Sequence, residues 1–314
     1  MSILIVLAMV LSFAGCGSEP AAEGKYTVGI CQLVQHEALD AATLGFKEAL
    51  SEKLGEDVVF IEHNASGDAA TCITICNQLV SENVDLIMGN ATAALQAAAS
   101  ATSDIPIVGT SITDYATALE IEGWTGKTGR NITGTADLAP LSEQAAMIPE
   151  LFPDAKKVGI LYCSAEPNSV YQVELIQGYL EEMGYTCAQF GFADVNELAA
   201  VAQSACDASD VIYIPTDNTC ATYTENIANV VLPAGVPVVA GESNTCAGCG
   251  VVTLSIDYYD LGYTTGQMAA KILTGEADIS TMPVQFAPEV TKMYNAANCE
   301  ALGITIPEDY QPIG

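Results

Sequence analysis

Polar side chains gather directly after several short apolar runs of this chain, and they are its most informative chemistry. The clusters are Asn90-Ala91-Thr92, Thr110-Ser111-Ile112-Thr113-Asp114, Ser164-Ala165-Glu166-Pro167-Asn168-Ser169, Thr216-Asp217-Asn218 and Glu242-Ser243-Asn244. They offer hydroxyls, amides and carboxylates, but no nucleophile paired with a base. This chemistry indicates a small polar ligand held by hydrogen bonds, and therefore a binding protein before an enzyme.

The apolar runs in front of these clusters must position them. A run such as Val211-Ile212-Tyr213-Ile214 is short and does not alternate with polar residues. That pattern is typical of strands buried on both faces of a parallel sheet. Ligands of open parallel sheets bind outside the carboxyl ends of the strands, so the polar clusters are expected to face one cleft.

Strand and helix patterns alternate along the whole chain in two series of similar length. This predicts an α/β fold with two doubly wound parallel-sheet lobes joined by hinge crossovers, near residues 134–140 and 257–260. The expected domains are 26–134 with 256–283 for lobe 1, and 135–255 with 284–314 for lobe 2.

Local signals mark several helix starts. Asp68 is expected to cap one helix, and Ser169-x-x-Gln172 and Thr222-x-x-Glu225 are predicted to be capping boxes of two others. Residues 114–131 are expected to form a Gly-rich loop.

Composition narrows the class of partner. The 314 residues are half hydrophobic, and 39 acidic residues against 9 Lys and Arg give a net charge of -30. A sizeable core is therefore available, and disorder is not expected. So negative a surface repels phosphate backbones, which makes nucleic acid a poor partner.

The first residues resemble a lipoprotein signal. Ile3 to Phe13 is apolar but shorter than the roughly 20 residues that span a bilayer, as in a signal-peptide core. Phe13-Ala14-Gly15-Cys16 resembles a lipobox, in which Cys16 is acylated. We expect residues 1–16 to be a signal peptide, 17–25 a linker, and the protein to be extracytoplasmic and lipid-anchored to the cell membrane.

Ten further cysteines are compatible with export, which permits disulfides. Cys246 and Cys249 are open to three interpretations: a surface disulfide, a metal site or free thiols. Cys31, Cys163, Cys187, Cys206 and Cys299 are expected to be small buried hydrophobes. A structural zinc site needs four ligands, and no such set is evident, so neither a metal nor a cofactor is predicted.

Several motifs allow a structural and a functional interpretation. Glu166, Asn168 and Ser169 can reach a ligand or only order a helix start. Asp217 stands at a strand end, where it can hold an ammonium group or form an Asx-turn. Thr92 can help to bind a carboxylate or can be only a cap.

The segment after the first strand lacks the glycines of a dinucleotide site, and no P-loop, G-x-S-x-G or HExxH motif occurs in the chain. No catalytic constellation is visible, so an enzyme is not predicted.

Several motifs together resemble a known family. They are Ala14-Gly15-Cys16, Gln35-His36-Glu37-Ala38-Leu39-Asp40-Ala41, Asp104-Ile105-Pro106-Ile107-Val108, Gly129-Arg130-Asn131-Ile132-Thr133-Gly134, Ser164-Ala165-Glu166-Pro167-Asn168-Ser169, Thr216-Asp217-Asn218 and Ile256-Asp257-Tyr258-Tyr259-Asp260-Leu261-Gly262. With them the chain resembles the substrate-binding lipoproteins of ABC importers with the type I periplasmic-binding-protein fold, and most closely the subgroup that binds tryptophan, tyrosine or phenylalanine.

The resemblance implies a monomer that clamps an amino acid, expected to be aromatic, between its lobes and delivers it to an ABC permease and its ATPase. It places Asp217 on the ligand's ammonium and lobe 1 hydroxyls on its carboxylate. The expected ligand-binding residues are Gln35, His36, Thr92, Thr110, Ser111, Thr113, Asp114, Glu166, Asn168, Ser169, Asp217, Asn218 and Glu242.

Two alternatives remain open at this point. The same two-lobed fold also serves membrane-anchored ligand sensors or receptors. The cysteine pair Cys246 and Cys249 would alternatively fit a thiol-redox or metal-binding surface protein.

Overall fold

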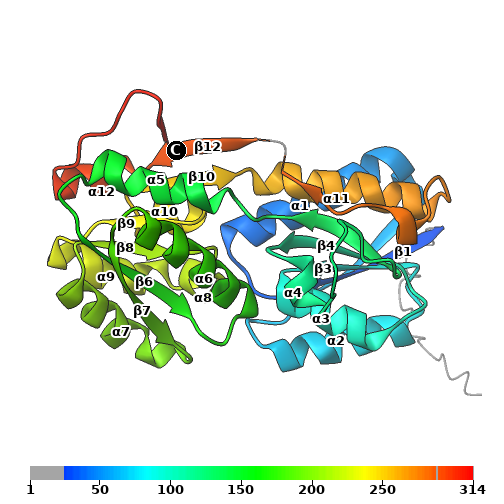
Figure 1. Cartoon of the computed structure of the whole chain (residues 1–314). Helices are drawn as coiled ribbons and strands as arrows, with labels where there is room; N and C mark the ends of the chain where they lie inside the picture. Colours follow the sequence, from blue (N-terminus) through cyan, green and yellow to red (C-terminus); the bar gives the residue numbers. More distant parts are fainter. Residues whose placement is uncertain (1–24, 288, 314) are drawn as a thin grey trace, which may run out of the picture.

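The computed structural model describes residues 25–287 and 289–313, and its strands form two sheets in two lobes (Figure 1). In the first sheet the order is β11-β5-β4-β3-β1-β2, and every pairing is parallel. The bounds are β1 Tyr26–Gln32, β2 Val58–Asn64, β3 Leu86–Asn90, β4 Ile107–Ile112, β5 Ile132–Ala136 and β11 Gln285–Phe286.

Helices cover both faces of the first sheet. One face is packed by α1 (Glu37–Leu54) and α11 (Tyr258–Leu273), which lie side by side. The other face is packed by α2 (Ala69–Ser81), α3 (Thr92–Ala101) and α4 (Tyr115–Ala118). Short 3₁₀ helices occupy Gly55–Asp57 and Ile279–Thr281. The strands are therefore enclosed on both sides, as their apolar sequences predict.

The second sheet has the order β13-β12-β10-β9-β8-β6-β7. Only the pairing of β12 with β10 is antiparallel. The bounds are β6 Lys157–Cys163, β7 Thr186–Phe192, β8 Val211–Ile214, β9 Val238–Ala240, β10 Val252–Ile256, β12 Val290–Tyr294 and β13 Gln311–Pro312.

Two helix layers enclose this sheet as well. Residues of α5 and α6 pack in one core cluster, and residues of α7 and α9 pack in another. The helices of this lobe are α5 Leu141–Leu151, α6 Pro167–Glu182, α7 Val195–Ala208, α8 Asn218–Thr222, α9 Thr224–Ala234, α10 Ser243–Gly248 and α12 Ala296–Leu302. The predicted class, two doubly wound α/β lobes, is confirmed.

The chain passes between the lobes after β5, after β10 and after β11 (Figure 1). Two of these crossovers lie where the sequence predicts them. The first sheet takes in β5 as far as Ala136, and also β11 at Gln285–Phe286. It therefore extends beyond the lobe boundaries expected at 134 and 283.

The helices α1 and α11 approach each other closely because glycines face the contact. A methyl group at Gly45 would overlap the carbonyl oxygen of Tyr259, and one at Gly262 would overlap that of Ala42. Since both helices begin beside the gap between the lobes, this packing fixes their first residues, Glu37 and Tyr258, relative to each other.

Of the predicted helix caps, Asp68 is confirmed and the two capping boxes are wrong. Asp68 caps α2 through the N–H groups of Ala70 and Thr71, as predicted. The Ser169 capping box is wrong, because α6 already begins at Pro167 and Gln172 instead bonds the backbone of Thr216.

The second predicted capping box is also wrong. A separate short helix, α8, ends at Thr222, whose hydroxyl donates to the carbonyl of Asn218. The next helix, α9, begins at Thr224 without a side-chain cap. The expected loop 114–131 contains one short helix, α4, capped by Asp114.

All ten cysteines of the described segments are free thiols. Cys246 and Cys249 are fully buried, so they do not form the surface disulfide considered above. Cys187 is half-buried, whereas Cys31, Cys163, Cys206 and Cys299 are buried as predicted. Within residues 25–287 and 289–313 no group of three or more His, Cys, Asp or Glu side chains is placed to hold a metal ion.

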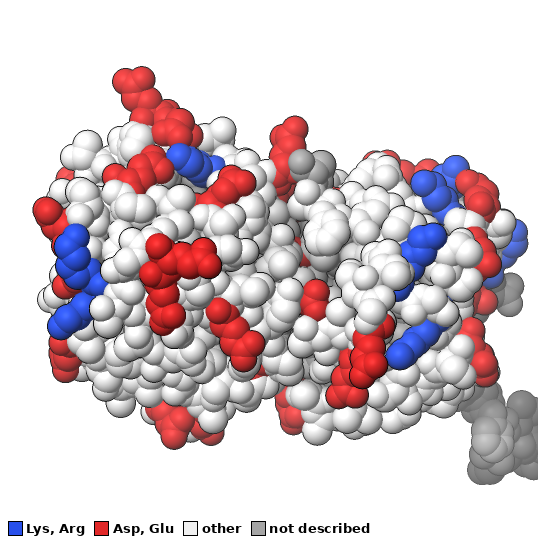
Figure 2. Space-filling view, viewed as in Figure 1, with Lys and Arg blue, Asp and Glu red and all other residues white. Residues whose placement is uncertain are grey.

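The lipobox with Cys16 lies outside the described residues. Among the helices that the structure does describe, none combines the length and the apolar character needed to cross a membrane. Figure 2 shows acidic side chains scattered over the visible face with few basic ones between them, as the net charge of -30 leads one to expect.

Candidate ligand-binding site

A narrow cavity lies between the lobes, at the carboxyl ends of strands from both sheets. Its free space is about 10 Å³, which is room for roughly one water molecule. The lining residues are His36, Ala38, Leu39, Ser111, Thr113, Asp137, Asn168, Thr216, Asp217, Asn218, Ala221, Glu242 and Tyr258.

The cavity brings together about half of the residues predicted from the sequence. His36, Ser111, Thr113, Asn168, Asp217, Asn218 and Glu242 line it, and Glu166 lines a neighbouring groove. Gln35 is exposed outside the cavity, and Asp114 is half-exposed as the cap of α4. Thr92, Thr110 and Ser169 are buried without lining the cavity.

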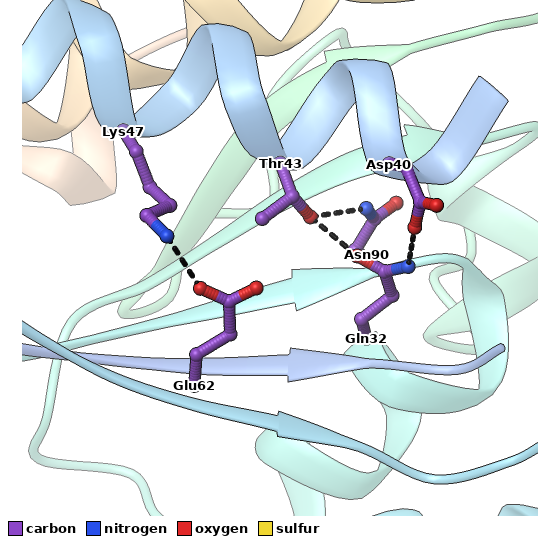
Figure 3. Close-up of polar contacts among 6 residues, drawn as sticks. All are labelled: Gln32, Asp40, Thr43, Lys47, Glu62 and Asn90. Carbon is purple, nitrogen blue, oxygen red and sulfur yellow. Dashed lines mark hydrogen bonds and ion pairs between the residues drawn. The ribbon is translucent and has the colours of Figure 1, made fainter. Parts of the chain in front are cut away.

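The lobe 1 wall is held in place by a hydrogen-bond network beneath α1 (Figure 3). Gln32 donates to Asp40 at 2.7 Å and accepts from the Thr43 hydroxyl at 2.6 Å. Asn90 donates to the same hydroxyl at 3.0 Å and to the Leu39 carbonyl at 2.8 Å. The amide of Asn90 therefore anchors α1, which carries Leu39 into the cavity.

A bulge in β4 turns Ser111 toward the cavity. The register between β4 and β5 shifts between Gly109 and Ile112, and Ser111 has a φ of 57°. Bulges commonly re-aim a side chain in this way. Ser111 Oγ is buried and has no hydrogen-bond partner among the described residues. Its hydroxyl is thus available to a ligand.

Asp217 is more deeply built into lobe 2 than its place in a loop predicts, because its side chain is only 1% exposed. Oδ1 accepts from the Cys220 N–H at 2.8 Å, and Oδ2 accepts from the Cys163 N–H at 2.7 Å. Asp217 thus caps α8 and ties it to the end of β6. Asp217 therefore orders the start of the next helix, which is the structural role considered for it, and it also lines the cavity.

Two further carboxylates serve helix starts. Glu166 accepts from the backbone N–H and side-chain amide of Asn218 at 3.0 and 2.7 Å. It also accepts from the N–H and hydroxyl of Thr219 at 2.8 and 2.7 Å. Glu242 caps α10 by accepting from the N–H groups of Asn244 and Thr245. These carboxylates are held by lobe 2 itself.

Asp137 is a site residue that the sequence analysis missed. It follows β5 at the first crossover and is 3% exposed. Oδ2 accepts from the Tyr258 hydroxyl at 3.1 Å, whereas Oδ1 has no partner among the described residues. The signal in the sequence is its position after a strand, but the small and polar residues of β5 do not resemble a buried strand.

The cavity is strongly negative. Asp137, Asp217 and Glu242 line it, and no Lys or Arg does. Burial raises the pKa of Asp137 to about 6, and the hydrogen bond from the Tyr258 hydroxyl opposes this rise. Burial, and then the charge of Glu166, raise the pKa of Asp217 to about 7. Buried carboxylates without a protein cation favour a positively charged group in the cavity.

A wider groove of about 550 Å³ opens beside the cavity and shares Asn168 and Asn218 with it. Several of its lining residues are apolar: Leu33, Val34, Ala93, Pro167 and Val195. Cavity and groove together offer a charged inner end and a partly apolar outer part.

Two lobes on a multiple-crossover hinge, with a polar cavity at their strand ends, define a ligand-binding protein of the type I periplasmic-binding-protein fold. The chain belongs to the family of ABC transporter substrate binding proteins, whose model matches residues 27–311.

Individual relatives agree with this assignment. The chain is 32% identical over 296 residues to the tyrosine-binding protein of Clostridioides difficile (strain R20291), covering 91% of this chain and 85% of that protein. It is 32% identical to an ABC domain from Streptococcus pneumonia solved in complex with L-Trp, with a TM-score of 0.87 and coverage of 92% and 99%.

A third comparison is with an open, ligand-free structure of a substrate binding protein with adhesive properties from Clostridium difficile. The identity is 33%, the TM-score 0.71, and the coverage again 92% and 99%. At nearly equal identity, this chain therefore superposes better on the L-Trp complex than on the open structure.

Proposed function

We propose that this substrate-binding protein carries an amino acid, with an aromatic side chain, to an ABC permease and its ATPase. The observation that carries the proposal is the negative cavity between the lobes, which contains three carboxylates and no protein cation along its lining. An amino acid supplies the missing positive charge as its ammonium group. The two relatives with tyrosine and L-Trp in their descriptions support the aromatic side chain.

The carboxylate and the side chain of such a ligand would also meet suitable protein groups. Its carboxylate would face hydroxyls of lobe 1, above all Ser111 and Thr113. Its side chain would extend into the groove with Leu33, Val34 and Val195. Of the predicted ligand-binding residues, we retain the seven that line the cavity, together with Glu166 in the groove, as the walls of the ligand site.

Binding requires hinge motion, because the cavity has room for roughly one water molecule and not for an amino acid. The ligand would enter while the lobes stand apart and would be enclosed when they close. Contacts from both lobes at once supply the differential affinity that closure needs. The higher TM-score against the L-Trp complex than against the open structure fits a closed arrangement.

The cellular setting follows from the family and from the N-terminal motif. We propose an extracytoplasmic monomer anchored by a lipid on Cys16. Replacement Cys16→Ser should release the protein from the membrane fraction into the soluble extracytoplasmic fraction. Retention of the variant in the membrane fraction would contradict the anchor without affecting the ligand proposal.

The ligand is tested by calorimetric titration of protein that begins at Lys25 with each of the common amino acids. L-Tyrosine or L-tryptophan should bind, and ligand at 100 times its dissociation constant should stabilise the fold by about 2.7 kcal/mol. No heat and no thermal shift with any amino acid at millimolar concentration would contradict an amino-acid ligand.

Uptake assays separate transport from sensing. Deletion of the gene should abolish import of the bound amino acid if the protein serves a permease. Unchanged import with altered gene expression would favour the sensor alternative. The thiol alternative has no structural support, since Cys246 and Cys249 are buried at 0% and 1% exposure. Thiol titration of denatured, unreduced protein should accordingly detect both.

A further inference from the structure

One carboxylate oxygen in the cavity is left without a partner. Asp137 is 3% exposed, and its Oδ1 has no hydrogen-bond partner among the described residues. The other oxygen, Oδ2, accepts from the Tyr258 hydroxyl at 3.1 Å. Because a buried, unsatisfied carboxylate oxygen is costly, this arrangement points to a missing donor on the cavity side.

The neighbouring carboxylates differ in this respect. Both oxygens of Asp217 accept backbone N–H groups at 2.7 and 2.8 Å, and both oxygens of Glu242 accept N–H groups of α10. Glu166 is saturated by Asn218 and Thr219. These three residues hold lobe 2 together with or without a ligand, whereas Asp137 Oδ1 does not serve the fold.

The size of the cavity restricts what can meet this oxygen. About 10 Å³ accommodates a single water-sized group. An ammonium group is of that size, carries up to three donors and is positively charged. Directly beside Asp137 the ligand's own carboxylate would be repelled, and an aromatic ring would not fit.

We propose that the inner cavity is an ammonium subsite in which Asp137 Oδ1, and not Asp217, accepts the ligand's amino group. This inference rests on the proposed amino-acid ligand. Asp217 then acts as a positioning residue, which holds the start of α8 and with it Asn218 at the cavity.

Tyr258 is the second positioning residue of this subsite. It begins α11 directly after the second crossover, and Asp137 stands at the first crossover after β5. Their hydrogen bond therefore links two of the three chain segments that connect the lobes. The ammonium group would consequently bind beside two of the segments that connect the lobes.

The test compares an amino acid with its analogue that lacks only the amino group. L-Tyrosine and 3-(4-hydroxyphenyl)propionate are titrated into the full mature chain and into three variants: Asp137→Asn, Asp217→Asn and the control Asp278→Asn, whose carboxylate is exposed and caps a short 3₁₀ helix. If L-tyrosine does not bind but another amino acid does, that amino acid and its des-amino analogue replace the pair.

Asp137→Asn should weaken L-tyrosine binding by roughly 100-fold and leave binding of the des-amino analogue within threefold of the parent. Asp217→Asn should weaken L-tyrosine binding by less than tenfold, and Asp278→Asn should not change it. Asp137→Asn should fold, since it replaces a buried charge by an amide of the same shape, and circular dichroism and the melting temperature check this.

The outcomes separate the inference from the function on which it rests. If the parent binds no amino acid, the proposed ligand class fails whatever Asp137 does. If the parent binds L-tyrosine and Asp137→Asn binds it within threefold, the ammonium subsite is overturned and the ligand class stands. Equal losses for L-tyrosine and its des-amino analogue would also overturn it, because Asp137 would then act only on the fold.

Discussion

His36 Nε2 lies 3.4 Å from Asn218 Oδ1, and this pair joins lobes whose two sheets share no strand. His36 precedes α1 as its N-cap residue, and Asn218 is the first residue of α8. Both line the inner cavity, and Asn218 also lines the groove outside it. The contact therefore stands between the two spaces, and it can form only while the lobes are together.

Replacing His36 by Ala should speed release of the ligand. One hydrogen bond contributes about 0.5–1.5 kcal/mol, so the affinity for L-tyrosine should fall about 2- to 12-fold, mainly through a faster off-rate. Stopped-flow fluorescence measures that rate. Gln35→Ala is the matched control, since Gln35 is the exposed neighbour outside the cavity. Equal effects of the two substitutions would show that the cross-lobe contact is irrelevant.

Asp217→Ala should destabilise the fold itself, without any ligand. The substitution removes the cap of α8 and leaves the buried Cys163 N–H without its acceptor. Losing such groups costs about 1–3 kcal/mol, which urea unfolding of the ligand-free protein measures. Asp278→Ala, which removes an exposed cap, should cost less. An unchanged unfolding free energy would mean that Asp217 does not serve the fold.

Affinity should depend on pH through the buried carboxylates. Only an ionised Asp137 pairs with an ammonium, and its pKa is raised to about 6 by burial, so affinity should fall about tenfold between pH 7.5 and pH 5. Asp217, with a pKa raised to about 7, faces the same cavity and would steepen the fall. Glu242, Glu166, His36 and Tyr258 are the other titratable groups around them.

The ligand-free protein should show the opposite trend. A carboxylate whose folded pKa lies above its unfolded value binds more protons when folded, so the free energy of unfolding contributed by Asp137 and Asp217 should fall as pH rises from about 4 to 7. Tyr258→Phe removes a hydrogen bond to Asp137 and should move the fall in affinity to higher pH. Urea unfolding of the ligand-free protein at several pH values measures the first trend, and calorimetric titration with the ligand measures the second. An unfolding free energy or an affinity that does not change with pH would contradict the corresponding trend.

Gly262→Ala should weaken lobe 1 through the contact of α11 with α1. The added methyl group overlaps the Ala42 carbonyl oxygen, and overpacking of this kind typically costs about 1–3 kcal/mol. Gly178→Ala on α6 is the control, because a methyl group there meets no atom within 4 Å. Thermal unfolding should show a lower melting temperature only for Gly262→Ala. Equal melting temperatures would argue against close packing of the two helices.

Much of the fold could be predicted from the sequence because apolar runs and helix periodicity are local signals. The strand Val211–Ile214 and the helix capped by Asp68 are examples in which local pattern and tertiary packing agree. By contrast, β5 consists of Ile132-Thr133-Gly134-Thr135-Ala136, whose small and polar residues do not resemble a buried strand. It becomes a strand because β4 and β11 pair with it on both sides.

The site was less predictable from the sequence, because it depends on contacts between distant elements and not on local patterns. Position after a strand correctly indicated His36, Ser111 and Asn218 as residues that line a common cavity. It could not reveal Asp137, which follows the missed strand. Nor could it show whether a carboxylate is used by the fold. Asp217 accepts the N–H of Cys220 nearby and that of Cys163 at the end of β6, whereas Asp137 Oδ1 has no partner among the described residues. The sequence around Asp217 does not reveal that Cys163 lies next to it in the fold.

The order of segments along the chain has a consequence for biosynthesis. The first sheet begins at Tyr26 but needs α11 and β11, and the second sheet needs β12 and β13, all of which lie within residues 258–312. While this last part is still being synthesised, α1 lacks the helix that packs along it and neither sheet is complete. Because long-range contacts of this kind form late, the chain is expected to stay open for most of its synthesis.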